Sequence, residues 1–204
     1  MSRQKFIYDG GKFVCPLVCG QCEAKSRTGQ RCRLRTCRAL PYCWIHTRML
    51  LKIRVGKSCY VQGGGLFAWN PREKKKPLFK PNDMIAPYIG ERVTMQELDR
   101  RYGEDGLAPY ALADSVLPTQ DAACKRGIGA WANAPEGLRV REKQRQKGRQ
   151  NAALNAYDGK YYLFATRNIR HGEEILVNYG NTYFKDGGKP HKTTHVKPKS
   201  TKTC

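Results

Sequence analysis

The feature that most constrains the fold is the segment of residues 151–184, in which two short β-like runs are separated by turn residues. Residues 160–166 follow the turn pair Asp158-Gly159, and residues 173–179 are entered through His171-Gly172. Their aromatic and β-branched side chains suit a half-buried sheet. The segment therefore predicts a two-stranded element with short polar connections.

The size and charge of the chain limit its domain organisation and the kind of partner it can bind. With 204 residues, 40% of them hydrophobic, it can form one modest core plus a small module. The net charge of +21 predicts an anionic partner, such as nucleic acid, a nucleosome surface or an acidic protein. No run approaches the ~18 apolar residues of a membrane span, and the apolar residues 13–18 are broken by Pro16. We expect a soluble, intracellular protein with no membrane partner.

Cysteine and histidine residues near the N-terminus indicate a metal site. The nine cysteines are an odd number and six precede residue 48, which favours metal in a reducing compartment over disulfides. The best-ordered set of four soft ligands, typical of structural zinc, is Cys22, Cys32, Cys43 and His46. Other partitions remain open: Cys19 and Cys22 also form a ligand-like pair, and Cys37 could replace Cys32. Residues 1–48 are predicted to form this module.

The same module has a recognisable pattern and a strong basic character. Residues 22–24, 29–32 and 43–46 read C-x-A, G-x-x-C and C-x-x-H, which resembles small Cys-Cys-Cys-His knuckles. Residues 1–58 contain thirteen Lys and Arg against two Asp and Glu. This excess fits a solvated face and a phosphate-contacting surface equally well.

Several local signals predict secondary structure in the middle of the chain. Residues 51–55 and 83–88 are predicted strands. Thr94 and Glu97 form a capping box, which predicts a short helix over Met95–Tyr102 that stops at Gly103.

Four short motifs follow one another along the chain. They are G-G-G-L-F-A at 63–68, Y-I-G-E at 88–91, the D-A to G-I-G-A-W-A-N segment at 121–133, and a closing motif made of N-A at 151–152 and A-x-R-x-I-x-x-G-E-E-I-x-x-x-Y-G-x-x-Y at 165–183. This order resembles SET-domain protein lysine methyltransferases. The resemblance implies a mostly β fold with short helices, several small sheets and a knot-like C-terminal crossing, here over residues 49–184.

The resemblance also implies the roles of individual residues. Tyr179 would be the catalytic tyrosine, and Tyr88 and Tyr110 would line the channel for the substrate lysine. Residues implied to bind S-adenosylmethionine (SAM) are Gly63, Gly64, Gly65, Leu66, Asn133, Ala134, Tyr179 and Tyr183. Ala134 departs from the family, which usually has histidine there. The three cysteines that often follow the domain are also missing, since only Cys204 is present.

Two further basic segments complete the chain. The insert of residues 135–150 has six Lys and Arg against one Glu within residues 139–150, and the tail of residues 185–204 is rich in Lys, Gly, Pro and Thr. The tail is predicted to be disordered, and the insert either a solvated loop or a contact to DNA or an acidic histone surface.

These patterns predict a SAM-dependent lysine methyltransferase with structural zinc, acting on histones or nucleosomes in the nucleus. The alternative is a catalytically weak or inactive SET-like zinc protein that binds nucleic acid or chromatin. The patterns leave the target lysine, the number of methyl groups and the oligomeric state open.

Overall fold

The structure is a computed structural model that describes residues 5–8, 12–17, 19–36, 40–58, 60, 63–104, 108–113, 117–134 and 150–178. The chain forms two compact units. Unit 1 contains Met1–Leu51, Ile85–Ala130 and Asn155–Leu163, and unit 2 contains Lys52–Met84, Trp131–Leu154 and Phe164–Cys204. The domain boundaries expected from the sequence at residues 48 and 184 stay a prediction.

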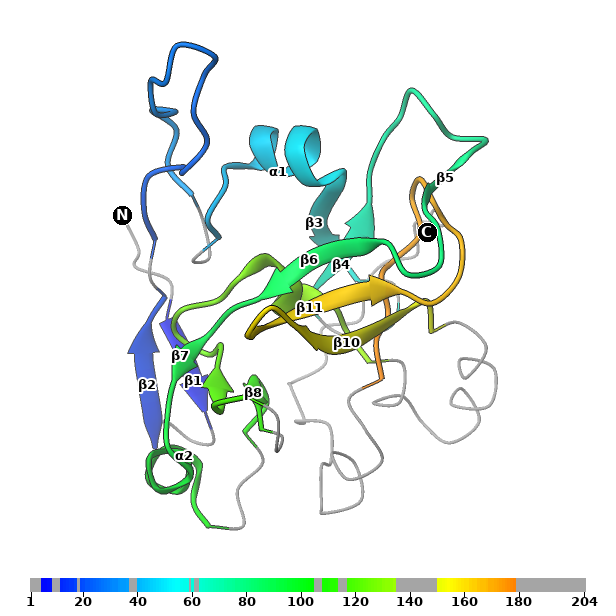
Figure 1. Cartoon of the computed structure of the whole chain (residues 1–204). Helices are drawn as coiled ribbons and strands as arrows, with labels where there is room; N and C mark the ends of the chain where they lie inside the picture. The colour runs from blue at the N-terminus through cyan, green and yellow to red at the C-terminus, as the bar shows by residue number, and fades with distance from the viewer. Residues whose placement is uncertain are drawn as a thin grey trace, which may run out of the picture. The chain divides into compact units, whose positions relative to one another are not determined.

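Short strands outnumber helices among the described elements, as Figure 1 shows. The helices are α1 (Trp44–Leu51), α2 (Met95–Tyr102) and the 3-10 helix η2 (Ile128–Trp131). The strands are β1 (Lys5–Tyr8), β2 (Phe13–Pro16), β3 (Ile53–Lys57), β4 (Gly64–Ala68), β5 (Pro77–Phe79), β6 (Met84–Tyr88), β7 (Glu91–Arg92), β8 (Ala111–Leu112), β9 (Gln120–Asp121), β10 (Ala152–Tyr157), β11 (Lys160–Ala165) and β12 (Ile169–Arg170).

The strands form several small sheets of two or three strands each. The pairings are β1 with β2, β3 with β4 and β5 with β12, and the three-stranded sheets have the orders β10-β11-β6 and β7-β9-β8. The predicted fold class, mostly β with short helices and several small sheets, is therefore confirmed.

The element α2 begins and ends where the sequence predicts. Thr94 is the N-cap, and its Oγ1 accepts a hydrogen bond from the backbone N–H of Glu97 at 3.1 Å. Gly103 follows the helix with a φ of 86°, a backbone conformation that glycine adopts without penalty. Leu98 and Tyr102 on the inner face of α2 pack with Tyr8 in a buried apolar cluster.

The strand pairing around residue 160 differs from the sequence expectation. Asp158 and Gly159 both have positive φ angles, of 48° and 67°, the two-residue turn that suits a tight hairpin. The chain therefore reverses there, and β11 lies between β10 and β6. Residues 174–177 do not pair with β11 and instead make isolated bridges to Phe67, Asn133 and Ala152.

A disulfide joins two distant parts of unit 1. Cys15 on β2 is bonded to Cys124, which lies 109 residues further along the chain. The sequence favoured metal for the N-terminal cysteines and left the role of Cys15 open. The pairing could not be expected from spacing, because it depends on β2 packing near the segment that follows β9.

Candidate functional site

The glycine strand β4 lies in unit 2 against a buried carboxylate. A Cβ atom added at Gly65 would overlap the carboxylate of Glu174 and would lie 3.1 Å from the Nδ2 of Asn133. Only glycine therefore fits at this position while Glu174 keeps its place. Gly63 has a φ of 120°, and no described atom lies within 4 Å of a Cβ added there. Leu66, within β4, is fully buried.

Asn133 holds the glycine strand and Glu174 together. Its Nδ2 donates to the carbonyl oxygen of Gly64 and to Oε1 of Glu174, both at 3.0 Å. The hydroxyl of Ser58 donates to the same Oε1 at 2.7 Å. Glu174 is 6% exposed, so these donors compensate a buried negative charge. The sequence analysis did not single out Glu174 or Ser58, although the Glu-Glu pair in the motif was a signal for the former.

Asn151 fixes the segment that leads toward Tyr179. Its buried side chain donates from Nδ2 to the carbonyl of Glu174 at 2.8 Å and accepts from the N–H of Leu176, also at 2.8 Å. The backbone N–H of Val177 donates to the carbonyl of Asn133 at 2.9 Å. Segments far apart in the sequence thus meet in one hydrogen-bonded cluster, with Ala134 buried beside Asn133.

The two predicted channel tyrosines lie in unit 1 and contact one another. The hydroxyl of Tyr88, on β6, donates to the carbonyl oxygen of Tyr110 at 2.8 Å. The guanidinium of Arg126 lies 3.7 Å from the centre of the Tyr110 ring, and Phe6 meets the ring edge-on at 5.5 Å. Arg126 is 5% exposed and donates to the carbonyls of Ala122 and Ala123. The sequence analysis missed Arg126, although the pair Lys125-Arg126 interrupts a run of small and apolar residues.

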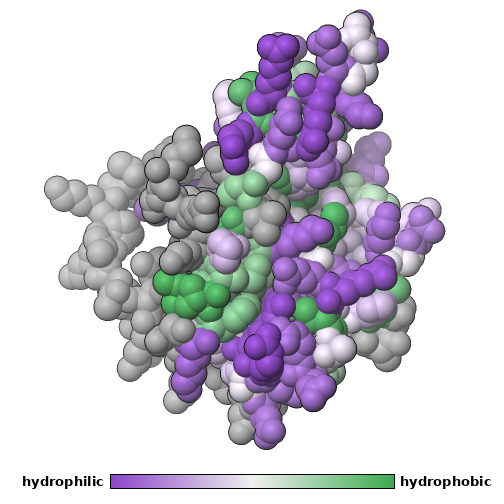
Figure 2. Space-filling view, turned by 90° about the vertical axis from the view of Figure 1, so that its left-hand side faces the viewer, coloured by the Kyte–Doolittle hydropathy of each residue, from purple (hydrophilic) through white to green (hydrophobic). Residues whose placement is uncertain are grey.

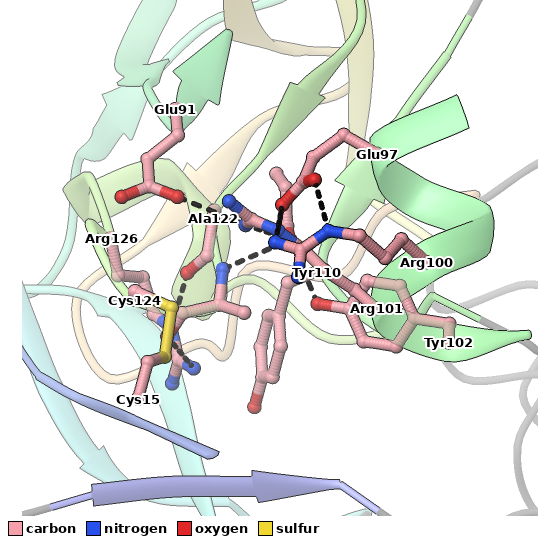
Figure 3. A network of polar contacts seen from close by, with 12 residues as sticks. Cys15, Glu91, Glu97, Arg100, Arg101, Tyr102, Tyr110, Ala122, Cys124 and Arg126 are labelled. Carbon is pink, nitrogen blue, oxygen red and sulfur yellow. Dashed lines mark hydrogen bonds and ion pairs between the residues drawn. A yellow bond between two sulfur atoms is a disulfide. The ribbon is translucent and has the colours of Figure 1, made fainter. Parts of the chain in front are cut away.

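A network of ion pairs supports the segment that precedes Arg126 (Figure 3). Asp121 is fully buried and accepts from Arg101 Nη1 at 2.8 Å and from the Tyr102 hydroxyl at 2.8 Å. Burial, followed by the charge of Asp121, raises the pKa of Tyr102 far above its usual value. Arg101 also pairs with Glu91 and Glu97. Hydrogen bonds from Arg100 and Arg101 lower the pKa of Glu97 to about 2.

The four predicted metal ligands meet in the N-terminal module. The ligand atoms of Cys22, Cys32, Cys43 and His46 all lie within 4.8 Å of one another. The Nδ1 of His46 is 3.4 Å from the sulfur of Cys22 and 3.2 Å from that of Cys43. A zinc ion with sulfur at about 2.3 Å and nitrogen at about 2.05 Å sets tetrahedral sulfur–nitrogen edges of about 3.6 Å. The donor set and its spacing therefore fit zinc.

The environment of Cys22 favours a thiolate. Burial raises the pKa of this thiol, but hydrogen bonds from the backbone N–H groups of Cys43 and Ala24 outweigh burial, so the pKa is lowered. A thiolate is the form that binds metal. Cys19, the alternative ligand, is a free and exposed thiol outside the group of four. Cys37, the other alternative, lies outside the described residues.

Several predicted features lie outside the described residues and stay predictions. They are Tyr179, Tyr183, the tail of residues 185–204 and, apart from residue 150, the insert of residues 135–150. Among the described residues, no helix is long and apolar enough to cross a membrane.

No protein-family model matches the sequence, and a search of curated proteins finds no match. Among solved structures, the chain is similar to the methyltransferase domain of human PR domain-containing protein 2, with 19% identity and a TM-score of 0.43. That similarity covers 64% of this chain and 78% of the other. The chain is also similar to a chain of ctPRC2 in complex with H3K27me3 and H3K27M, with 21% identity and a TM-score of 0.46. This second similarity covers 63% of this chain and 14% of the ctPRC2 chain.

Proposed function

We propose that this protein is a SAM-dependent protein-lysine N-methyltransferase with a SET fold and a structural zinc module. The observation that supports it most is the cluster of Gly64, Asn133, Asn151 and Glu174. These residues come from three motifs of the SET resemblance, since Asn151 and Glu174 share the closing one, and Asn133 lies 69 residues from Gly64 and 41 from Glu174 in the sequence. Motifs that are far apart in the sequence are therefore joined by hydrogen bonds in the folded chain.

The residues of unit 2 fit the polar, amino-acid part of SAM. Among the described residues, none occupies the Cβ side of Gly63, where a ligand could approach the backbone. Asn133 is held by Gly64 and Glu174, which sets the direction of its amide. The buried carboxylate of Glu174 gives this region a negative charge, which suits a ligand with a cationic amine. In this proposal Gly65, Leu66 and Ala134 shape the same surface, and Tyr183 covers the ligand.

When bound, SAM supplies a methyl group on a sulfonium, and the chain's own residues prepare the lysine that receives it. A lysine amine with a pKa near ~10.4 is almost fully protonated at neutral pH, so an apolar channel that disfavours the ammonium promotes reaction. Tyr88 and Tyr110 are proposed to line this channel and align the amine, and Tyr179 to orient it beside the methyl group. The proton then leaves to water.

The proposed substrates are histones or nucleosomes, and the proposed location is the nucleus. The net charge of +21 supports an anionic partner, and contact with DNA through the insert and the N-terminal module is part of this proposal. Zinc at the four-ligand group is proposed to hold the N-terminal module folded, because a segment this small has little apolar core of its own.

Methyl transfer from labelled SAM to nucleosomes and to free histones tests the proposal. The informative variant is Tyr179→Phe, and Tyr157→Phe is a matched control because this tyrosine is 60% exposed on β10, outside the proposed site. We expect label on a histone, lost with Tyr179→Phe and kept with Tyr157→Phe, while both variants still bind SAM. Unchanged turnover in Tyr179→Phe would remove this residue from the mechanism.

The second candidate is a SET-like zinc protein that binds nucleic acid or chromatin without catalysis. The alanine at position 134, where the family usually has histidine, favours it. If histones are not labelled and SAM does not bind, the result would support this non-catalytic candidate over the methyltransferase. SAM binding without labelled histones would direct the search to non-histone substrates.

A further inference from the structure

Residues 20–36 of the N-terminal module form a two-stranded antiparallel hairpin. Bridges pair Gln21 with Arg35 and Lys25 with Arg31. Between them, the N–H of Cys22 donates to the carbonyl of Leu34 at 2.9 Å, and the N–H of Cys32 to that of Ala24 at 2.8 Å. The chain reverses around Gly29, which has a φ of 80°.

This register places alternate residues on opposite faces, since successive side chains of a strand point to opposite sides. One face carries Cys22, Ala24 and Cys32, which are buried or half-buried at the metal-ligand group. The other face is exposed and carries Gln21, Glu23, Lys25, Arg31, Arg33 and Arg35. Because Cys22 and Cys32 face the metal-ligand group, the basic side chains that alternate with them face the opposite side.

Three cations on this face remain available to a partner. Arg31 is used within the hairpin, because its Nε donates to the carbonyl of Cys22 at 3.0 Å and its Nη2 to that of Gln21 at 2.9 Å. Within the described part of the chain, Lys25, Arg33 and Arg35 form no ion pair. Figure 2 shows hydrophilic side chains dominating the upper part of the view, where the hairpin lies.

We infer that the exposed face of this hairpin, through Lys25, Arg33 and Arg35, binds the phosphate backbone of a nucleic-acid duplex. The major groove of B-DNA admits a two-stranded β-ribbon, and the hairpin is such a ribbon with its cations on one face. Arginine presents a planar fork that binds phosphate through two hydrogen bonds. Gln21, on the same face, is used within the hairpin, because its Nε2 donates to the carbonyl of Cys32 at 2.9 Å. This inference rests on the DNA contact proposed above for the N-terminal module, but it is independent of methyl transfer and holds for an active or an inactive protein.

Duplex binding by the zinc-loaded chain of 204 residues tests the inference. The probe is a short fluorescent DNA duplex of arbitrary sequence, and affinity is measured by anisotropy over a series of salt concentrations. The test variant is Lys25→Gln/Arg33→Gln/Arg35→Gln. The matched control is Lys74→Gln/Lys75→Gln/Lys76→Gln, which removes the same charge from an exposed run in unit 2.

Each phosphate contact contributes about 0.9 to the slope of log K against log salt. We expect the hairpin variant to lower that slope by about 2.7 and to weaken binding, while the control lowers it by less than about 1. The zinc content of both variants should equal that of the parent. If the triple variant loses zinc, single Arg33→Gln and Arg35→Gln variants are measured, each with an expected decrease of about 0.9.

Equal losses in the hairpin variant and the control would overturn the inference, because they would show that net charge alone sets duplex affinity. A hairpin variant that binds the duplex normally but no longer binds polyglutamate would also overturn it, and would assign this face to an acidic protein.

Discussion

Substituting Gly65 by alanine tests whether the Glu174 cluster holds the glycine strand in place. The added methyl group would occupy the position of the Glu174 carboxylate, so that carboxylate must move. Moving it breaks the hydrogen bonds that Oε1 accepts from Ser58 at 2.7 Å and from Asn133 at 3.0 Å. Hydrogen bonds to a charged group contribute about 1.5–3 kcal/mol each. Because partial relaxation recovers some of this energy, we expect Gly65→Ala to lower the free energy of unfolding by about 3 kcal/mol.

The assay is urea denaturation of the zinc-loaded chain, followed by circular dichroism. The control is Gly20→Ala, because a Cβ at Gly20 meets its nearest atom, the Oγ1 of Thr36, at an unstrained 4.0 Å. It should change stability by less than about 1 kcal/mol, with a small gain expected from the stiffer unfolded chain.

A double-mutant cycle with Glu174→Ala identifies the cause of the loss. Once the carboxylate is gone, alanine at position 65 no longer displaces it, and its effect should fall below about 1 kcal/mol. A loss of the same size in both backgrounds would refute the reasoning, since the cost would then have nothing to do with Glu174.

Three further predictions concern other parts of the molecule. Cys43→Ala should abolish binding of zinc and Cys19→Ala should retain it, as measured by metal analysis of the purified chains. Asp121→Asn removes a fully buried charge from its partners and should cost about 3–5 kcal/mol in urea denaturation, against less than about 1 kcal/mol for Glu173→Gln at a partly exposed ion pair. The pKa of Glu97 is lowered in the folded state from 4.5 to about 2, so its contribution to stability is present above pH 4.5 and is lost as pH falls through 2. Nuclear magnetic resonance titration of its carboxyl carbon should give that low value, and a midpoint near 4.5 would contradict the two ion pairs.

Features that depend on neighbours in the sequence were predictable. The helix α2 begins after Thr94 and ends before Gly103, because a hydroxyl cap and a glycine act within one turn. The spacing of Cys43 and His46 brings two ligands to one side of a single helical turn, and the four ligands chosen from the sequence do meet. The turn at Asp158-Gly159 was also predictable, although the strand that pairs across it was not.

The sequence by itself determined the bounds of α2, the turn at Asp158-Gly159, the order of the SET-like motifs and the chemistry of the proposed metal site, because these depend on residue type and short spacing. Only the tertiary structure decided that Ser58 and Glu174, 116 residues apart, share a hydrogen bond, that Arg126 stacks on Tyr110, and that Cys15 pairs with Cys124. The physical reason is that the partner of a buried charge or thiol is the group that tertiary packing places next to it. That packing depends on how the small sheets assemble, which no local pattern encodes.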